Sequence, residues 1–174
     1  MKKVIGVIAI LALVFTSCSK EMSLQKYMVT KSGEDGFLTI NVPASMLQFK
    51  DGEESEENVE ALKKFKRLNV LVYKHDDSLA VDQKKEVAQI KRILENAKFN
   101  ELMSVNMDGN FGVLSYSGGE EEIDEVVAFG ENDMGFLIAR ITGDKMNVKQ
   151  LAKLASSIDL SNLEEMKNIN FGNN

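Results

Sequence analysis

Two side chains of this 174-residue chain, Cys18 and His75, offer the widest chemistry, and each is the sole residue of its type. A nucleophilic cysteine needs a histidine or a cation beside it to lower its pKa, and these two lie far apart in sequence. His75 precedes Asp76 and Asp77 in "YKHDDS", where a carboxylate could orient it as a general base or a metal ligand. An exposed loop histidine is the simpler interpretation, because the chain has no Gly-x-Ser-x-Gly elbow.

The surroundings of Cys18 indicate a different use for its thiol. Lys2 and Lys3 precede a mostly apolar run over residues 4–15, and the small pair Thr16-Ser17 stands directly before the cysteine. This is the layout of an export signal, and its last residues resemble a bacterial lipobox. We therefore expect residues 1–17 to be a lipoprotein signal peptide and Cys18 to be lipidated, with diacylglycerol and a fatty chain such as palmitate. A free thiol after an ordinary signal peptide is the alternative.

The predicted anchor places the protein in the cell envelope. The apolar run is shorter than the roughly 20 residues that a membrane-spanning helix needs, so the lipid would hold the chain at the bilayer surface. Ser19-Lys20-Glu21 partly matches the signals that direct such lipoproteins to the outer face. We expect the outer membrane, and leave open whether the protein faces the periplasm or the cell surface.

Composition and charge exclude several classes of function. Hydrophobic residues make up 44% and charged residues 28% of the chain, which is typical of a globular protein. With Cys18 lipidated, no cysteine remains for a disulfide or a thiolate metal site. Loss of Lys2 and Lys3 leaves 19 basic and 27 acidic residues, a formal charge of −8. This balance opposes nucleic-acid binding, and we expect no cofactor and no metal.

Two acidic runs, residues 51–57 and 118–125, supply oxygen atoms that calcium could use. Neither has the Asp-x-Asp-x-Asp-Gly loop, and adjacent carboxylates on a strand point to opposite faces. Solvated surface is the favoured interpretation, with weak cation binding as the alternative. The nine methionines are scattered, and we interpret them as core filling or partner contact.

Periodicity and turn signals divide the chain into a tether and one domain. Residues 18–36 are predicted to be a lipid-anchored tether with a possible short helix around Leu24 to Val29, and residues 37–174 a single domain. Helices are predicted after the caps Ser55, Asp82 and Asn147, with a last short one from Ser161. Strands are predicted in alternating or apolar segments, at residues 37–42, 68–73, 101–107, 110–116, 122–129 and 135–142.

This order of elements predicts an α+β fold. Short connections such as Asp108-Gly109 make the last four strands an antiparallel meander. About three amphipathic helices would cover the apolar face of a mostly antiparallel sheet, giving a two-layer sandwich.

Four segments carry a resemblance to a known family: "INVPASML", "LNVLVYKHDD", "FNELMSVNMDGNFGVLSY" and "GFLIARITGDKMNVKQLAKLAS". They are similar to the small Bacteroidota envelope lipoproteins that form the domain of unknown function 4252 family. The resemblance covers roughly residues 37–160. It implies this fold and location and assigns no catalytic residue.

The expected function is that of a non-catalytic binding module. Its membrane contact would be through the lipid on Cys18, and its partner would be another envelope protein, docked on a sheet edge or on an exposed sheet face. One alternative is a small-ligand module with a pocket between helices and sheet. The other is an enzyme that uses His75 with acidic residues distant in sequence.

Overall fold

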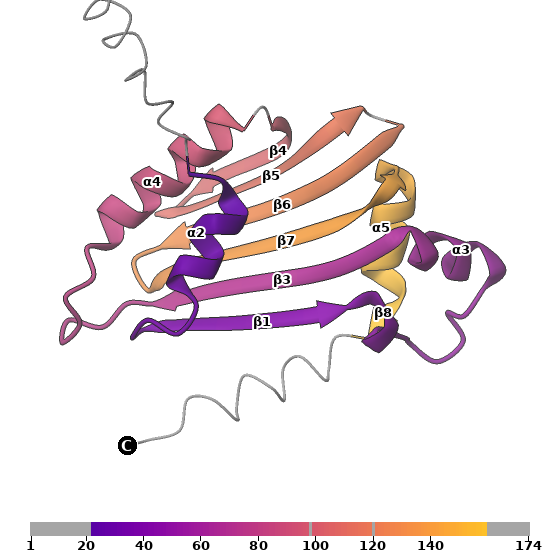
Figure 1. The fold of residues 1–174 in the computed structure, drawn as a ribbon, viewed down its shortest axis with the longest axis horizontal. Coiled ribbons are helices and arrows are strands. Elements are labelled where there is room, and N and C mark those ends of the chain that lie inside the picture. The colour runs from indigo at the N-terminus through magenta and orange to yellow at the C-terminus, as the bar shows by residue number, and fades with distance from the viewer. Residues whose placement is uncertain (1–21, 98, 120, 160–174) are drawn as a thin grey trace, which may run out of the picture.

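The computed structural model describes residues 22–97, 99–119 and 121–159. The predicted signal peptide, Cys18 and the helix predicted from Ser161 lie outside these residues. Figure 1 shows the arrangement of the elements.

Within the described residues, four α-helices are formed where the sequence supplies a cap. Ser23, Ser55, Asp82 and Asn147 each accept a hydrogen bond from the backbone N–H three residues later, which satisfies a free donor of the first turn. The three predicted caps are thus confirmed. The helices are α2 (Leu24–Lys31), α3 (Glu56–Lys64), α4 (Gln83–Asn96) and α5 (Val148–Ser157).

Six strands form one antiparallel sheet in the order β1-β3-β7-β6-β5-β4. The predicted meander of β4 to β7 is confirmed, and β4 and β1 form the two edges. The strands are β1 (Phe37–Pro43), β3 (Phe65–Lys74), β4 (Asn100–Met107), β5 (Asn110–Gly119), β6 (Glu122–Asn132) and β7 (Gly135–Met146). A short 3-10 helix (Ala44–Met46) leads to β2 (Gln48–Phe49), which pairs with β8 (Ile158–Asp159).

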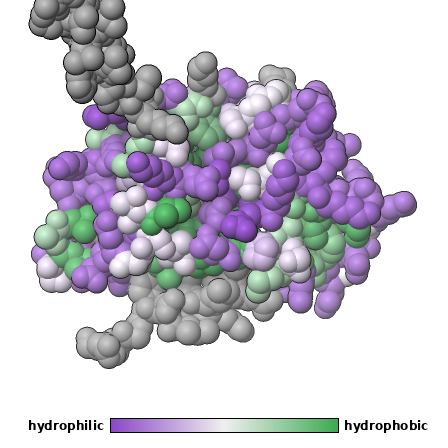
Figure 2. Space-filling model, viewed as in Figure 1, coloured by the Kyte–Doolittle hydropathy of each residue, from purple (hydrophilic) through white to green (hydrophobic). Residues whose placement is uncertain are grey.

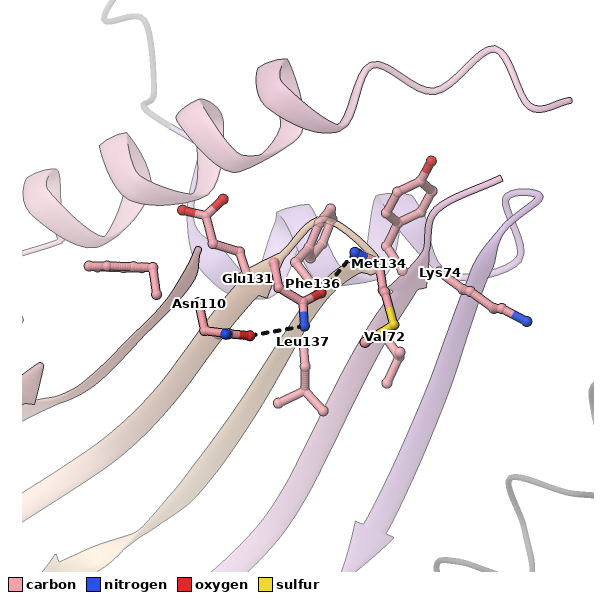
Figure 3. A pocket seen from close by; sticks show the side chains of 12 residues that line it. Val72, Lys74, Asn110, Glu131, Met134, Phe136 and Leu137 are labelled. Carbon is pink, nitrogen blue, oxygen red and sulfur yellow. Dashed lines mark hydrogen bonds between the residues drawn. The ribbon is translucent and has the colours of Figure 1, made fainter. Parts of the chain in front are cut away.

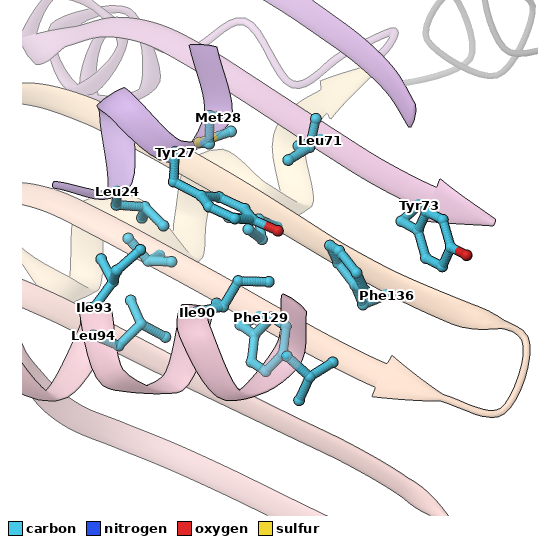
Figure 4. Packing of buried hydrophobic residues seen from close by; sticks show 13 residues of the cluster. Leu24, Tyr27, Met28, Leu71, Tyr73, Ile90, Ile93, Leu94, Phe129 and Phe136 are labelled. Carbon is cyan, nitrogen blue, oxygen red and sulfur yellow. The ribbon is translucent and has the colours of Figure 1, made fainter. Parts of the chain in front are cut away.

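Helices α2 and α4 cover one face of the sheet, called here the front face. Figure 4 shows Leu24, Tyr27 and Met28 of α2 and Ile90, Ile93 and Leu94 of α4 packed with strand residues. The strand residues of this cluster are Leu71, Tyr73, Val127, Phe129, Phe136 and Ile138. They alternate along β3, β6 and β7, so they share one face.

Helices α3 and α5 pack on the opposite, back face. Their cluster includes Ala61, Leu154, Val126 and Ile141. Ile141 is an odd number of residues from Phe136 and Ile138 along β7, so its side chain points to the opposite face of the sheet. The α+β class and the antiparallel sheet are confirmed, but the expectation that all helices cover one face is wrong. Each face carries an apolar cluster that helices cover, because β3 and β7 have hydrophobic side chains on both sides of the sheet.

The tether predicted over residues 18–36 is too long. It contains α2, in which Leu24, Tyr27 and Met28 are 3%, 1% and 5% exposed and belong to the front-face core. The short helix expected around Leu24 to Val29 is present and runs on to Lys31. The domain therefore begins before Phe37, because three buried side chains on one side of α2 are enough to attach this short helix to the sheet.

Candidate functional site

The half of the back face that no described helix covers is apolar across all six strands. The register aligns two rows of paired residues, from edge to edge of the sheet. Each row has six residues, none of them polar or charged, and the two rows together are called here the open face. The rows are Ile40, Val70, Ala139, Ala128, Leu114 and Met103, and Leu38, Val72, Leu137, Gly130, Gly112 and Val105.

Much of this open face is accessible. Met103, Val105 and Leu137 are 58%, 49% and 37% exposed, and Figure 3 shows Leu137 pointing to the side of the sheet opposite Phe136. Apolar patches of this kind on a soluble domain mark interaction sites. Beside α5 the surface deepens into an apolar groove of about 360 Å³, where Val70 and Ala139 meet Leu151 and Leu154.

The β4 edge adjoins the open face. All eight residues of β4 are exposed, and Glu101 is its one charged residue. Edge strands usually carry lysine, proline or a cover that prevents another strand from pairing with them. The other edge, β1, ends at Pro43 and has buried Ile40 and Val42. Strand β4 is thus the edge better suited to strand addition.

A second uncovered region lies on the front face, between α2 and strands β1, β3 and β7. It is a polar cleft of about 790 Å³, called here the front cleft. Figure 2 shows the front face of the molecule, whose surface is mostly hydrophilic. The front cleft is lined by Gln25, Met28, Val29 and Ser32 of α2 and by Thr39, Asn41, Lys66, Arg67, Asn69, Arg140 and Thr142 of the strands.

The pocket in Figure 3 lies at the β6–β7 hairpin and has a volume of about 430 Å³. Its polar groups already bond one another, since Asn132 donates to Asn110 Oδ1 at 3.3 Å and accepts from the Met134 N–H at 2.9 Å. These hydrogen bonds stabilise the turn, and they leave few free donors or acceptors on Asn110 and Asn132 for a ligand to bind.

His75 lies on the surface just after β3. Its Nε2 is 3.2 Å from Asp77 Oδ1, and its backbone N–H donates to the Met134 carbonyl at 2.8 Å. Asp76 accepts two hydrogen bonds from Ser78, which hold the pKa of its carboxyl below the usual range. Within residues 22–97, 99–119 and 121–159, no three His, Cys, Asp or Glu residues gather as metal ligands.

The acidic runs contribute surface ion pairs. Glu57 pairs with Lys153, whose hydrogen bond lowers the pKa of the Glu57 carboxyl. Glu122 pairs with Lys145 at 2.9 Å, and this hydrogen bond raises the pKa of Lys145. Glu125 accepts two hydrogen bonds from Arg140, at 2.7 and 3.1 Å. These carboxylates already have cationic partners.

None of the helices in the described part of the chain is long and apolar enough to cross a bilayer. Cys18, the predicted lipidation site, lies outside that part. From the sequence we expected an exposed sheet face and, as an alternative, a pocket between helices and sheet. The residues that form the open face and the front cleft were not named, because each set depends on strand register.

Comparison with known proteins identifies the family. No curated protein and no solved structure matches the chain. The model of the family described as a domain of unknown function, DUF4252, matches residues 27–154, from within α2 to within α5. The match covers well over half of the sequence, and the chain belongs to this family.

Proposed function

We propose that this protein is a non-catalytic binding module, held at the outer membrane by a lipid on Cys18, that binds another envelope protein through the open face. The location is supported by the export signal and the lipobox-like residues before Cys18. The binding role is supported by one observation above all, the two apolar rows that cross the sheet without a polar side chain.

The shape of the open face favours a partner with apolar side chains. Gly112, Gly130, Ala128 and Ala139 occupy its middle and leave the sheet backbone close to the surface. Larger residues stand to either side, with Met103 and Val105 toward β4 and Leu137 on β7. Burial of apolar area contributes about 25 cal/mol per Å², so side chains that fill this shallow trough would supply most of the affinity.

Val105→Asp is expected to weaken partner binding at least tenfold. A carboxylate within an apolar contact would be desolvated without a partner. Val105 is 49% exposed, so the fold should persist. The measurement is site-specific photocrosslinking from position 137 in intact cells.

The matched control is Val29→Asp, the same change at a 66% exposed position on α2, on the other side of the sheet. It should leave the crosslinked product unchanged. Equal crosslinking in both variants, or no specific product from position 137 in the unaltered protein, would refute binding through the open face.

Cys18→Ser is expected to release the protein from membranes. An acylated protein gains about 0.8 kcal/mol for each buried methylene group, and serine cannot form the thioether. Fractionation should move the variant from the membrane pellet to the soluble fraction. Mass spectrometry of the unaltered protein should find fatty chains on Cys18, and a free thiol there would contradict the proposed anchor.

A further inference from the structure

The front cleft has the size of a small-molecule site. Its volume of about 790 Å³ lies within the range of ligand pockets. Apolar contacts come from Met28 and Val29 of α2, while the floor is built from polar side chains of β1, β3 and β7. The register places these in two rows, one of Asn41, Asn69 and Arg140 and one of Arg67 and Thr142, with Glu125 of β6 beside Thr142.

A β-bulge brings two cations to this cleft. Phe65 and Arg67 of β3 face the adjacent residues Gly143 and Thr142 of β7, so Lys66 is an extra residue in the strand. Consecutive residues of a regular strand point to opposite faces, whereas bulges redirect side chains and are common beside binding sites. Here Lys66 and Arg67 both line the cleft.

The described residues do not neutralise these two cations. Arg140 is bound to Glu125 through its Nε and Nη2, but neither Lys66 nor Arg67 has an ion pair within the described residues. The chain as a whole has a net charge of −6. Two uncompensated positive charges in one cleft of an acidic protein favour an anionic ligand.

The floor of the cleft also offers hydrogen bonds. Thr39 Oγ1 is buried and has no hydrogen-bond partner among the described residues, which is costly for a hydroxyl. Asn69 donates to Asn41 Oδ1, and this bond fixes the two amides so that the Asn41 amino group remains available as a donor. A ligand hydroxyl that reached Thr39 Oγ1 would give this buried group a partner, and the exposed Asn41 amide could donate to the same ligand.

We propose that the front cleft binds a small hydroxylated organic anion. Its carboxylate or phosphate lies between Lys66 and Arg67, where the planar guanidinium matches either group, and its hydroxyl groups bond Thr39 and Asn41. This site is separate from the open face and does not depend on the role proposed for it.

Calorimetric titration of the detergent-solubilised full-length protein tests this site with three probes: glucuronate, glucose 6-phosphate and neutral glucose. We expect at least one anion to bind and glucose to bind at least tenfold more weakly. The ratio between the two anions decides which acidic group the site prefers. Glucose binding as tightly as the anions, or no binding of either anion, would overturn the proposal.

Substitutions distinguish the cleft from general surface charge. The pair Lys66→Ala and Arg67→Ala should weaken anion binding at least tenfold. The matched pair Lys84→Ala and Lys85→Ala removes the same charge from exposed positions of α4 and should leave binding unchanged. Equal loss in both pairs would show that net charge alone attracts the probes.

Thr39→Val tests the hydroxyl contact without altering side-chain shape. It should weaken binding of the hydroxylated anion several-fold and leave the melting temperature equal or higher, because it removes a buried hydroxyl that has no partner within the described part of the chain. Unchanged affinity in this variant would remove Thr39 from the site and contradict the proposed orientation of the ligand.

Discussion

Tyr27→Ala is expected to lower the free energy of unfolding by about 3–5 kcal/mol, the range found when large aromatic side chains are removed from a core. Tyr27 is 1% exposed and packs between α2 and the sheet (Figure 4). Its hydroxyl donates to Glu86 Oε2 of α4 at 2.8 Å. The substitution therefore leaves a cavity and removes a bond between the two front-face helices.

Urea denaturation, with Val29→Ala as the control, measures this loss. Val29 is on the same helix but 66% exposed, and its truncation should change stability by less than about 0.5 kcal/mol. Similar small effects in both variants would mean that α2 contributes little to the fold, as in a tether.

Tyr27→Phe removes only the hydrogen bond to a charged group and should cost about 1.5–3 kcal/mol.

The same contact predicts a loss of stability in alkaline solution. Burial, followed by the hydrogen bond to Glu86, raises the pKa of Tyr27 above its ordinary value of 10.0. In the unfolded chain this phenol ionises near pH 10, whereas in the folded protein it keeps its proton. Stability therefore falls as pH rises above about 10, and Tyr27→Phe should make that fall less steep.

Gly135→Ala is expected to cost about 3 kcal/mol at the start of β7. Gly135 has a φ of 140°, a conformation that L-residues rarely adopt. An added Cβ would lie 2.0 Å from the Tyr73 carbonyl oxygen and 3.0 Å from its carbon. Because both atoms belong to the backbone of the neighbouring strand, the β3–β7 pairing would have to separate.

Gly109→Ala separates the effect of space from that of conformation. Gly109 also has a positive φ, 76°, but no atom lies within 4 Å of the position of a Cβ. It should cost about 1 kcal/mol, from backbone strain alone. Thermal unfolding of both variants gives the comparison, and equal losses would show that the contact with Tyr73 is relieved without disturbing the sheet.

Local signals predicted the helices and the meander well. Ser55, Asp82 and Asn147 are caps whose effect extends over a few residues, and Asp108-Gly109 adopts the two positive φ values, 51° and 76°, of a tight hairpin. The position of β7 between β3 and β6 was not predicted, because it depends on pairing between residues far apart in the chain.

The candidate sites depend on the same long-range pairing. The open face exists because glycine, alanine and larger apolar residues of six strands fall into register, and no single strand shows this. Lys66 and Arg67 precede the strand expected at residues 68–73, and the bulge that brings them together leaves no clear mark in the sequence. His75 was singled out from its type and neighbours, and it contacts one exposed carboxylate, that of Asp77.

With the lipid proposed on Cys18, the attachment of α2 to the sheet would also determine how closely the protein follows the bilayer. Met22 packs against the front-face core and accepts a hydrogen bond from Gln89 at 3.1 Å. Cys18, which would carry the lipid, is four residues before Met22, and a fully extended chain of this length spans at most about 14 Å. The domain would then diffuse in two dimensions against the headgroups, and would meet only molecules that come to the same surface.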